Sequence, residues 1–240
     1  METAASMGNV DDAAISQGRG GEGVAAPPNF NGLWAEANGA VVPFGSARSH
    51  GQDDQFLGIS VQGAGPSTAI NPPPTPTFAG IASTPDGQGY WLLTAYGHVL
   101  AYDAPYYGSA DFKGATRPYG TETITTPRAA AGLAPTDGGK GYVVVARDGT
   151  TARFGKAPSC SLPAGVSVAG VAPDYRTGGY WVATTNGHVY ACQAPSYPYK
   201  TVAGTVTGIA ALGNGLGYRL VTSNGKVYDY GAAVWHGDPN

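Results

Sequence analysis

Residues 80–91 of the 240-residue chain read GIASTPDGQGYW, and four other segments repeat this pattern of two glycines among apolar and aromatic residues. In every copy the first glycine lies nine residues before the second. Five gapless matches do not arise by chance, so the chain is built of tandem repeats. The other copies are GVAAPPNFNGLW (23–34), GLAPTDGGKGYV (132–143), GVAPDYRTGGYW (170–181) and GIAALGNGLGYR (208–219).

Each copy continues into a hairpin pattern, with a short apolar stretch, a two-residue turn and a second alternating stretch. Asn-Gly and Asp-Gly turns favour a type I′ hairpin, in which both central residues have positive φ. A final short segment such as DAPYYGS (103–109) completes the unit, so each unit predicts four short strands. The turns are Asn38-Gly39, Tyr96-Gly97, Asp148-Gly149, Asn186-Gly187 and Asn224-Gly225.

Repeats of about 40 residues with four strands each are typical of propeller blades, which bury their faces by stacking around an axis. We therefore predict an all-β fold over residues 22–240, a five-bladed β-propeller of four-stranded blades. Packing between the first and fifth blades, or the N-terminal tail, would close the ring. The rival architecture is an open array of blades completed by a partner. The units cover about 23–51, 80–109, 132–161, 170–199 and 208–238, with insertions at 52–79 and 110–131.

The composition excludes several classes of protein. The 38 Gly and 19 Pro form about a quarter of the chain, twice the usual share, but 42% hydrophobic and 10% aromatic residues argue against disorder. A net charge of −3 speaks against nucleic acid as the main partner. No apolar run approaches the ~18 residues of a membrane span. The N-terminus lacks a basic segment followed by an apolar one, so we expect no secretory signal.

Two features fall outside the repeat pattern. Cys160 and Cys192 form no metal motif, and although they could pair, we expect two reduced, buried residues made in a reducing compartment. Residues 1–21 are rich in Gly and Ala and form an extended N-terminal tail. Alone, such a segment is expected to be disordered, and its most plausible role is docking onto another chain.

The unit resembles a tandem repeat of large proteins of high-GC Gram-positive bacteria and their phages, G-I-A-x-T-P-D-G-x-G-Y-W-L-V. Residues 80–93 match it most closely, and the resemblance covers about residues 22–238. It implies propeller modules found in surface or virion proteins rather than one defined chemistry. Val143 and Arg219 depart from it at the tryptophan, and Leu33 departs from it at the tyrosine.

Candidate ligand contacts are weighed against ordinary structural roles. Neighbouring residues of a strand point to opposite faces, so the pairs Tyr90-Trp91 and Tyr180-Trp181 are expected between blades. Aromatic and polar residues near the outer rim or at the turns are the better candidates, because they could stack on sugars or bind them by hydrogen bonds. These candidates are Trp235, Tyr107, His50, His236, His98, His188, Asn186 and Asn224.

No enzymatic or metal-binding signature stands out. The histidines recur at equivalent positions of different units, which would keep them apart, and their spacing fits no metal motif. A nucleophile elbow, a P-loop and a dinucleotide fingerprint are all lacking in the sequence. We therefore expect no cofactor, no metal and no catalytic residue.

The hypothesis that follows is a non-enzymatic structural and binding module. We favour a phage virion decoration or tail-associated protein, made in the host cytoplasm; the alternative locations are the cytoplasm and, by a non-classical route, the cell surface. Residues 1–21 would contact other virion or assembly proteins, and the propeller could contact a host-surface glycan or protein. The alternatives are a polysaccharide hydrolase or lyase, which needs two carboxylates in the central channel, and a cellular interaction scaffold.

Overall fold

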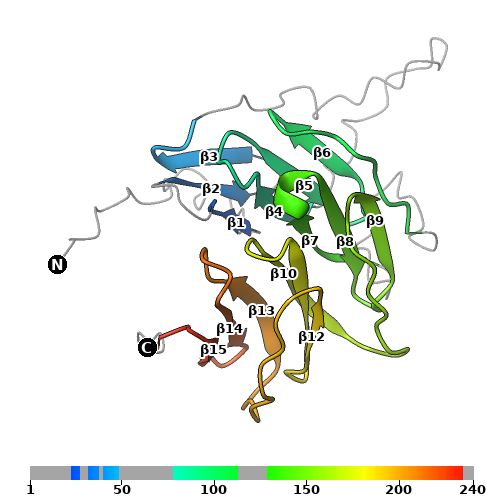
Figure 1. The fold of residues 1–240 in the computed structure, drawn as a ribbon, viewed down its shortest axis with the longest axis vertical. Coiled ribbons are helices and arrows are strands. Elements are labelled where there is room, and N and C mark those ends of the chain that lie inside the picture. Colours follow the sequence, from blue (N-terminus) through cyan, green and yellow to red (C-terminus); the bar gives the residue numbers. More distant parts are fainter. Residues whose placement is uncertain (1–22, 28–31, 38–39, 49–77, 113–128, 235–240) are drawn as a thin grey trace, which may run out of the picture.

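A computed structural model describes residues 23–27, 32–37, 40–48, 78–112 and 129–234 (Figure 1). Within these ranges the strands pair into five antiparallel sheets, each made of three strands consecutive in sequence, which we number 1 to 5. A short 3-10 turn, η2 (Asp137–Gly139), interrupts the strands of sheet 3. No helix in the described ranges is long and apolar enough to cross a membrane.

The strand bounds follow the repeats. Sheet 1 contains β1 (Gly23–Ala25), β2 (Gly32–Ala37) and β3 (Ala40–Gly45), and sheet 2 contains β4 (Phe78–Ser83), β5 (Tyr90–Thr94) and β6 (Val99–Tyr102). Sheet 3 contains β7 (Ala130–Thr136), β8 (Gly141–Ala146) and β9 (Thr151–Gly155). Sheet 4 contains β10 (Val168–Asp174), β11 (Gly179–Thr184) and β12 (Val189–Cys192). Sheet 5 contains β13 (Val206–Ala211), β14 (Gly217–Thr222) and β15 (Val227–Gly231). Each repeat thus forms one sheet, and the all-β expectation is confirmed.

Close contacts explain the second glycine of the repeat in sheets 2 to 5 and the first glycine in sheets 3 and 4, whereas a Cβ on Gly80 of sheet 2 would meet nothing within 4 Å. The first faces the next sheet: a Cβ on Gly170 would lie 3.3 Å from Cγ2 of Ile209 in β13. The second lies beneath the chain as it leaves the third strand, and a Cβ on Gly179 would overlap the carbonyl oxygens of Cys192 and Gln193. Gly89, Gly141 and Gly217 are enclosed by backbone in the same way.

The sheets have three strands where we expected four. Residues 103–112, 156–167 and 193–205, which contain the expected fourth strands of sheets 2, 3 and 4, form no strand. A proline in each segment removes a backbone donor, which disfavours ladder pairing. Side chains hold these segments instead: Nε1 of Trp91 donates to the carbonyl of Pro105 at 2.9 Å, and Nε1 of Trp181 donates to that of Pro195 at 2.8 Å.

The sheets follow one another around a common cavity (Figure 1). This cavity of about 380 Å³ is lined by residues of β1, β4, β7, β10 and β13, the first strands of all five sheets. Backbone hydrogen bonds link successive sheets at equivalent positions. The NH of Ala130 donates to the carbonyl of Ala95, that of Val168 to Arg147, and that of Val206 to Thr185, at 2.8, 2.8 and 2.9 Å.

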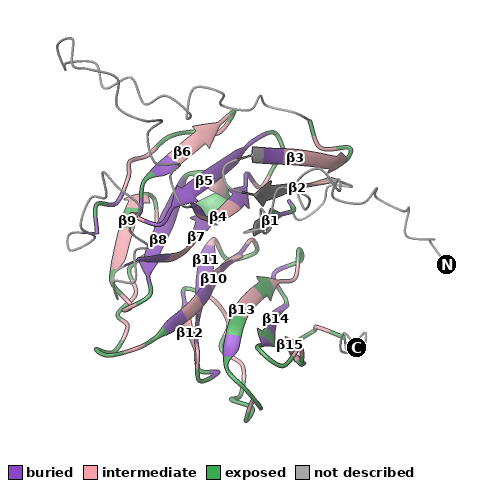
Figure 2. Ribbon diagram, turned by 180° about the vertical axis from the view of Figure 1, so that it is seen from behind, coloured by how far each residue is buried: buried purple, intermediate pink, exposed green. Residues whose placement is uncertain are grey.

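The core lies between neighbouring sheets, and the middle strands are its most buried parts (Figure 2). Tyr90 packs in the cluster shared with sheet 1, whereas the adjacent Trp91 packs toward sheet 3. In the same way, Tyr180 packs toward sheet 3 and Trp181 packs toward sheet 5. The expectation that these pairs lie between sheets is therefore confirmed. The side chain of Trp34 lies outside the described part.

The cysteines correct another expectation. Cys160 and Cys192 form a disulfide with a Cα–Cα distance of 5.3 Å, so the expectation of two reduced residues was wrong. The segment that follows β9 crosses to sheet 4 and brings Cys160 beside the end of β12. A sequence separation of 32 residues concealed this proximity.

Candidate binding site

Four of the five predicted hairpin turns lie in the described residues and occur where the sequence places them, whereas Asn38-Gly39 lies outside. The predicted type I′ geometry is wrong for these four, because only the glycine of each has positive φ: Gly97 (92°), Gly149 (86°), Gly187 (89°) and Gly225 (78°). A type I turn followed by a left-handed glycine gives the same hairpin. The asparagine or aspartate before the glycine therefore acts through its side chain rather than through a left-handed backbone.

Asn186 and Asn224 illustrate this local role. Oδ1 of each accepts a hydrogen bond from a threonine hydroxyl at 2.6 Å, that of Thr184 and Thr222 respectively. Oδ1 of Asn186 also accepts from the NH of His188 at 3.4 Å. Both asparagines are exposed, so their amide groups remain accessible from solvent while the oxygens hold the turn.

The two described histidine candidates lie on different sheets. His98 follows the turn of sheet 2, His188 follows that of sheet 4, and both are exposed. The ring of His188 stacks on the half-exposed ring of Tyr199, with centroids 4.5 Å apart and planes at 15°. Within the described ranges no group of three or more His, Cys, Asp or Glu side chains could hold a metal ion.

Tyr107 serves as an inter-sheet contact. Its hydroxyl donates to the carbonyl of Gly139 at 3.0 Å, and its ring centroid lies 5.6 Å from that of Tyr142 in β8. Its neighbour Tyr106 is 60% exposed and is the more accessible aromatic of this segment. The candidates His50, Trp235 and His236 lie outside the described residues.

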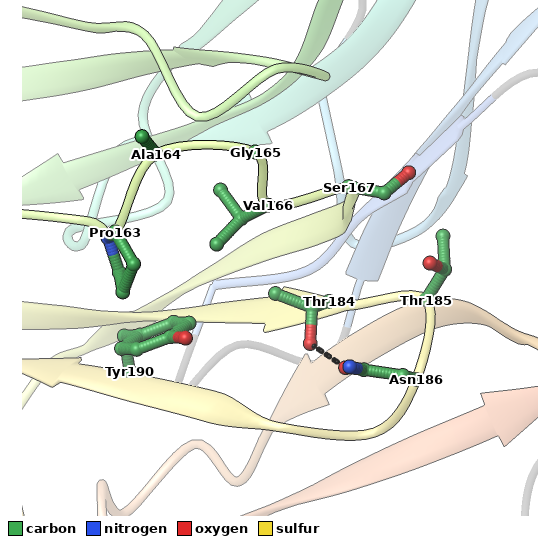
Figure 3. Close-up of a pocket in the computed structure, with 9 residues that line it drawn as sticks. All are labelled: Pro163, Ala164, Gly165, Val166, Ser167, Thr184, Thr185, Asn186 and Tyr190. Carbon is green, nitrogen blue, oxygen red and sulfur yellow. Dashed lines mark hydrogen bonds between the residues drawn. The ribbon is translucent and has the colours of Figure 1, made fainter.

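A pocket of about 330 Å³ opens beside the hairpin of sheet 4 (Figure 3). The loop 163–167 forms one wall, and β11, the turn and β12 form the other. The NH of Thr185 donates to the carbonyl of Ser167 at 2.8 Å and joins the two walls. The lining residues are Pro163, Ala164, Gly165, Val166, Ser167, Thr184, Thr185, Asn186 and Tyr190.

The pocket is chemically divided. Figure 3 shows Tyr190 beside Pro163 at one end, and the polar side chains of Ser167, Thr185 and Asn186 at the other. The described lining residues carry no charge, so the pocket suits a neutral ligand with an apolar face and several hydroxyl groups. Its volume lies at the lower end of ligand pockets, which fits a short saccharide unit.

The disulfide lies next to this pocket and connects its two walls. Cys160 precedes Pro163 by three residues, and Cys192 follows Tyr190 by two. The disulfide therefore ties the loop to the strand that carries the tyrosine. Of the candidate residues that the structure describes, only Asn186 belongs to the lining. Sequence reasoning missed Tyr190 because the pocket depends on a loop between repeats that carries no repeat signal.

The central cavity is mostly apolar. Its described lining contains no carboxylate, whereas glycoside hydrolysis uses two. Tyr175 and Ser83 are its polar members, and burial raises the pKa of the Tyr175 hydroxyl. The buried Asp174 beside it is engaged in its own turn, where its oxygens accept from the NH of Arg176 at 3.0 Å and the hydroxyl of Thr177 at 2.6 Å.

Comparison with known proteins identifies no family, so a proposal about function depends on the site. No protein-family model matches the chain, and no curated protein is significantly similar to it.

Proposed function

We propose that the chain is a non-enzymatic structural and binding module that holds a neutral host-surface glycan in the pocket of sheet 4. The observation that carries this proposal is the composition of that pocket. An uncharged lining places a tyrosine ring at one end and hydroxyl and amide groups at the other. Aromatic rings cover the apolar face of a sugar, while polar groups bind its hydroxyls.

We also propose that the five sheets are the blades of a closed five-bladed β-propeller. The support is the cavity lined by all five first strands, together with the repeated backbone links between successive sheets. The resemblance of the repeats to those of phage and surface proteins of high-GC Gram-positive bacteria favours the same architecture.

The setting that we propose is a virion, as a decoration or tail-associated protein. The disulfide between Cys160 and Cys192 supports a location of the mature protein in an oxidising environment, such as a virion or cell surface, since cytosolic thiols stay reduced. This replaces the expectation of a reducing compartment for the mature protein. Residues 1–21 remain the segment that we propose for contacts with other assembly proteins.

A pull-down on immobilised cell-envelope polysaccharide of a high-GC Gram-positive host tests the binding function. We expect saturable retention, weakened about tenfold in Tyr190→Ala because a stacking contact of that size is lost. The matched control Tyr106→Ala removes an exposed tyrosine outside the pocket and leaves retention unchanged. No retention on any neutral glycan, or equal retention of Tyr190→Ala, would contradict the proposal. Release of new reducing ends would favour a hydrolase.

A further inference from the structure

The polar residues and the tyrosine of the sheet 4 pocket recur in sheet 5 at a constant offset of 38 residues. The turn of sheet 5 carries Asn224, and Tyr228 follows it by four residues, as Tyr190 follows Asn186. Three hydroxyl-bearing positions recur as well. They are Ser167, Thr184 and Thr185 in sheet 4, and Thr205, Thr222 and Ser223 in sheet 5.

The other three repeats lack this set. At the position of the tyrosine, sheets 1, 2 and 3 have Val42, Leu100 and Ala152. At the position of Thr185, sheets 2 and 3 have Ala95 and Arg147, which carry no hydroxyl group. Sheets 2 and 3 nevertheless pair their second and third strands in the same antiparallel way. The hairpin itself therefore does not require the residues that only sheets 4 and 5 share.

The local geometry of the two sheets also agrees. The NH of Ser223 donates to the carbonyl of Thr205 at 2.8 Å, as the NH of Thr185 donates to that of Ser167. Oδ1 of Asn224 accepts from the hydroxyl of Thr222, as in the turn of sheet 4. Ser223, Asn224 and Thr205 are exposed. The hairpin of sheet 5 thus presents hydroxyl and amide groups beside the loop that precedes the sheet.

The tyrosine of sheet 5 is fixed against this loop. Its hydroxyl, on the half-buried Tyr228, accepts from the NH of Ala203 at 2.7 Å. In the loop, Thr201 and Gly204 replace Pro163 and Val166 of sheet 4, so the second set is less apolar than the first. The residues equivalent to the pocket lining, 201–205, 222–224 and 228, carry no charge.

We propose that sheet 5 holds a second site for a neutral saccharide unit, formed by Tyr228, Asn224, Ser223 and the loop 201–205. The inference rests on the proposed function, because the pocket of sheet 4 defines the class of ligand. One chain then carries two sites of the same chemistry on consecutive sheets. Binding of a repetitive polysaccharide at both sites raises its avidity above the affinity of either site.

Isothermal titration calorimetry with disaccharide fragments of the same envelope polysaccharide counts the sites. We expect two disaccharides per wild-type chain. Tyr190→Ala and Tyr228→Ala should each weaken their own site about tenfold through the lost ring contact, so that one site per chain remains within the range of the titration. The control Tyr106→Ala, which changes an exposed tyrosine outside both sites, keeps two.

A second variant guards against misfolding of Tyr228→Ala. Ser223→Ala removes one exposed hydroxyl group and should leave the melting temperature unchanged. It should weaken only the second site, about fivefold for the loss of one hydrogen bond. A single disaccharide per wild-type chain, or unchanged binding in Tyr228→Ala and Ser223→Ala, would overturn the inference and leave the proposed function intact. No disaccharide bound to the wild-type protein would contradict both.

Discussion

Replacing Cys160 and Cys192 together by serine measures what the disulfide contributes to the fold. The bond joins positions 32 residues apart and links sheet 3 to sheet 4. Loop-closure entropy gives a stabilisation of about 4 kcal/mol for a loop of this length. In a chain of this size, the loss corresponds to a fall in melting temperature of about 8–16 °C.

Differential scanning calorimetry of the wild-type protein, with and without dithiothreitol, checks this magnitude. The reductant should lower the melting temperature of the wild type to that of the double serine variant, and should leave the variant itself unaffected. A fall of less than about 2 °C in both comparisons would refute the reasoning. Two free thiols in the denatured, unreduced wild-type protein would do so as well.

Three further outcomes are expected. Trp181→Ala should lower the free energy of unfolding by about 3–5 kcal/mol in urea titrations, because it empties a fully buried site between sheets 4 and 5. Gly179→Ala should reduce the folded yield severely, because a Cβ there overlaps backbone oxygens, whereas Gly80→Ala should not, because a Cβ there meets nothing within 4 Å. Circular dichroism of the purified variants compares the two. Burial raises the pKa of Tyr180 to about 12 from an ordinary value of 10.0, so its neutral form stabilises the fold fully below pH 10 and progressively less up to pH 12. Urea midpoints from pH 9 to 12 should therefore fall, and less steeply in Tyr180→Phe.

The sheets could be predicted from the sequence because each repeat carries its own local signals. Gly-Tyr-Trp segments and Asn-Gly turns mark strands and hairpins within about 40 residues. The middle strands that these segments form are the most buried in the structure. The prediction of a fourth strand was wrong because it gave too little weight to Pro105 and Pro195, which remove a backbone donor. The hydrogen bonds that hold these segments come from tryptophan side chains fourteen residues away, which no local pattern signals.

The pocket and the disulfide lay beyond sequence reasoning because both join different units. Cys160 stands two residues after an Ala-Pro pair, as Tyr107 and Tyr197 do, but only the structure shows that this position contacts the next sheet. Tyr190 looks like any inward residue of an alternating strand until the loop 163–167 is placed against it. Of the residues that line the pocket, the sequence analysis identified only Asn186, through its turn motif.

Hydrogen exchange of the free and glycan-saturated protein tests the central claim most directly. The account predicts slower exchange in residues 163–167 and 184–190, the two walls of the pocket, with little change around the central cavity. Protection confined to the strands that line the central cavity, or no protection at a glycan concentration that saturates retention, would contradict it.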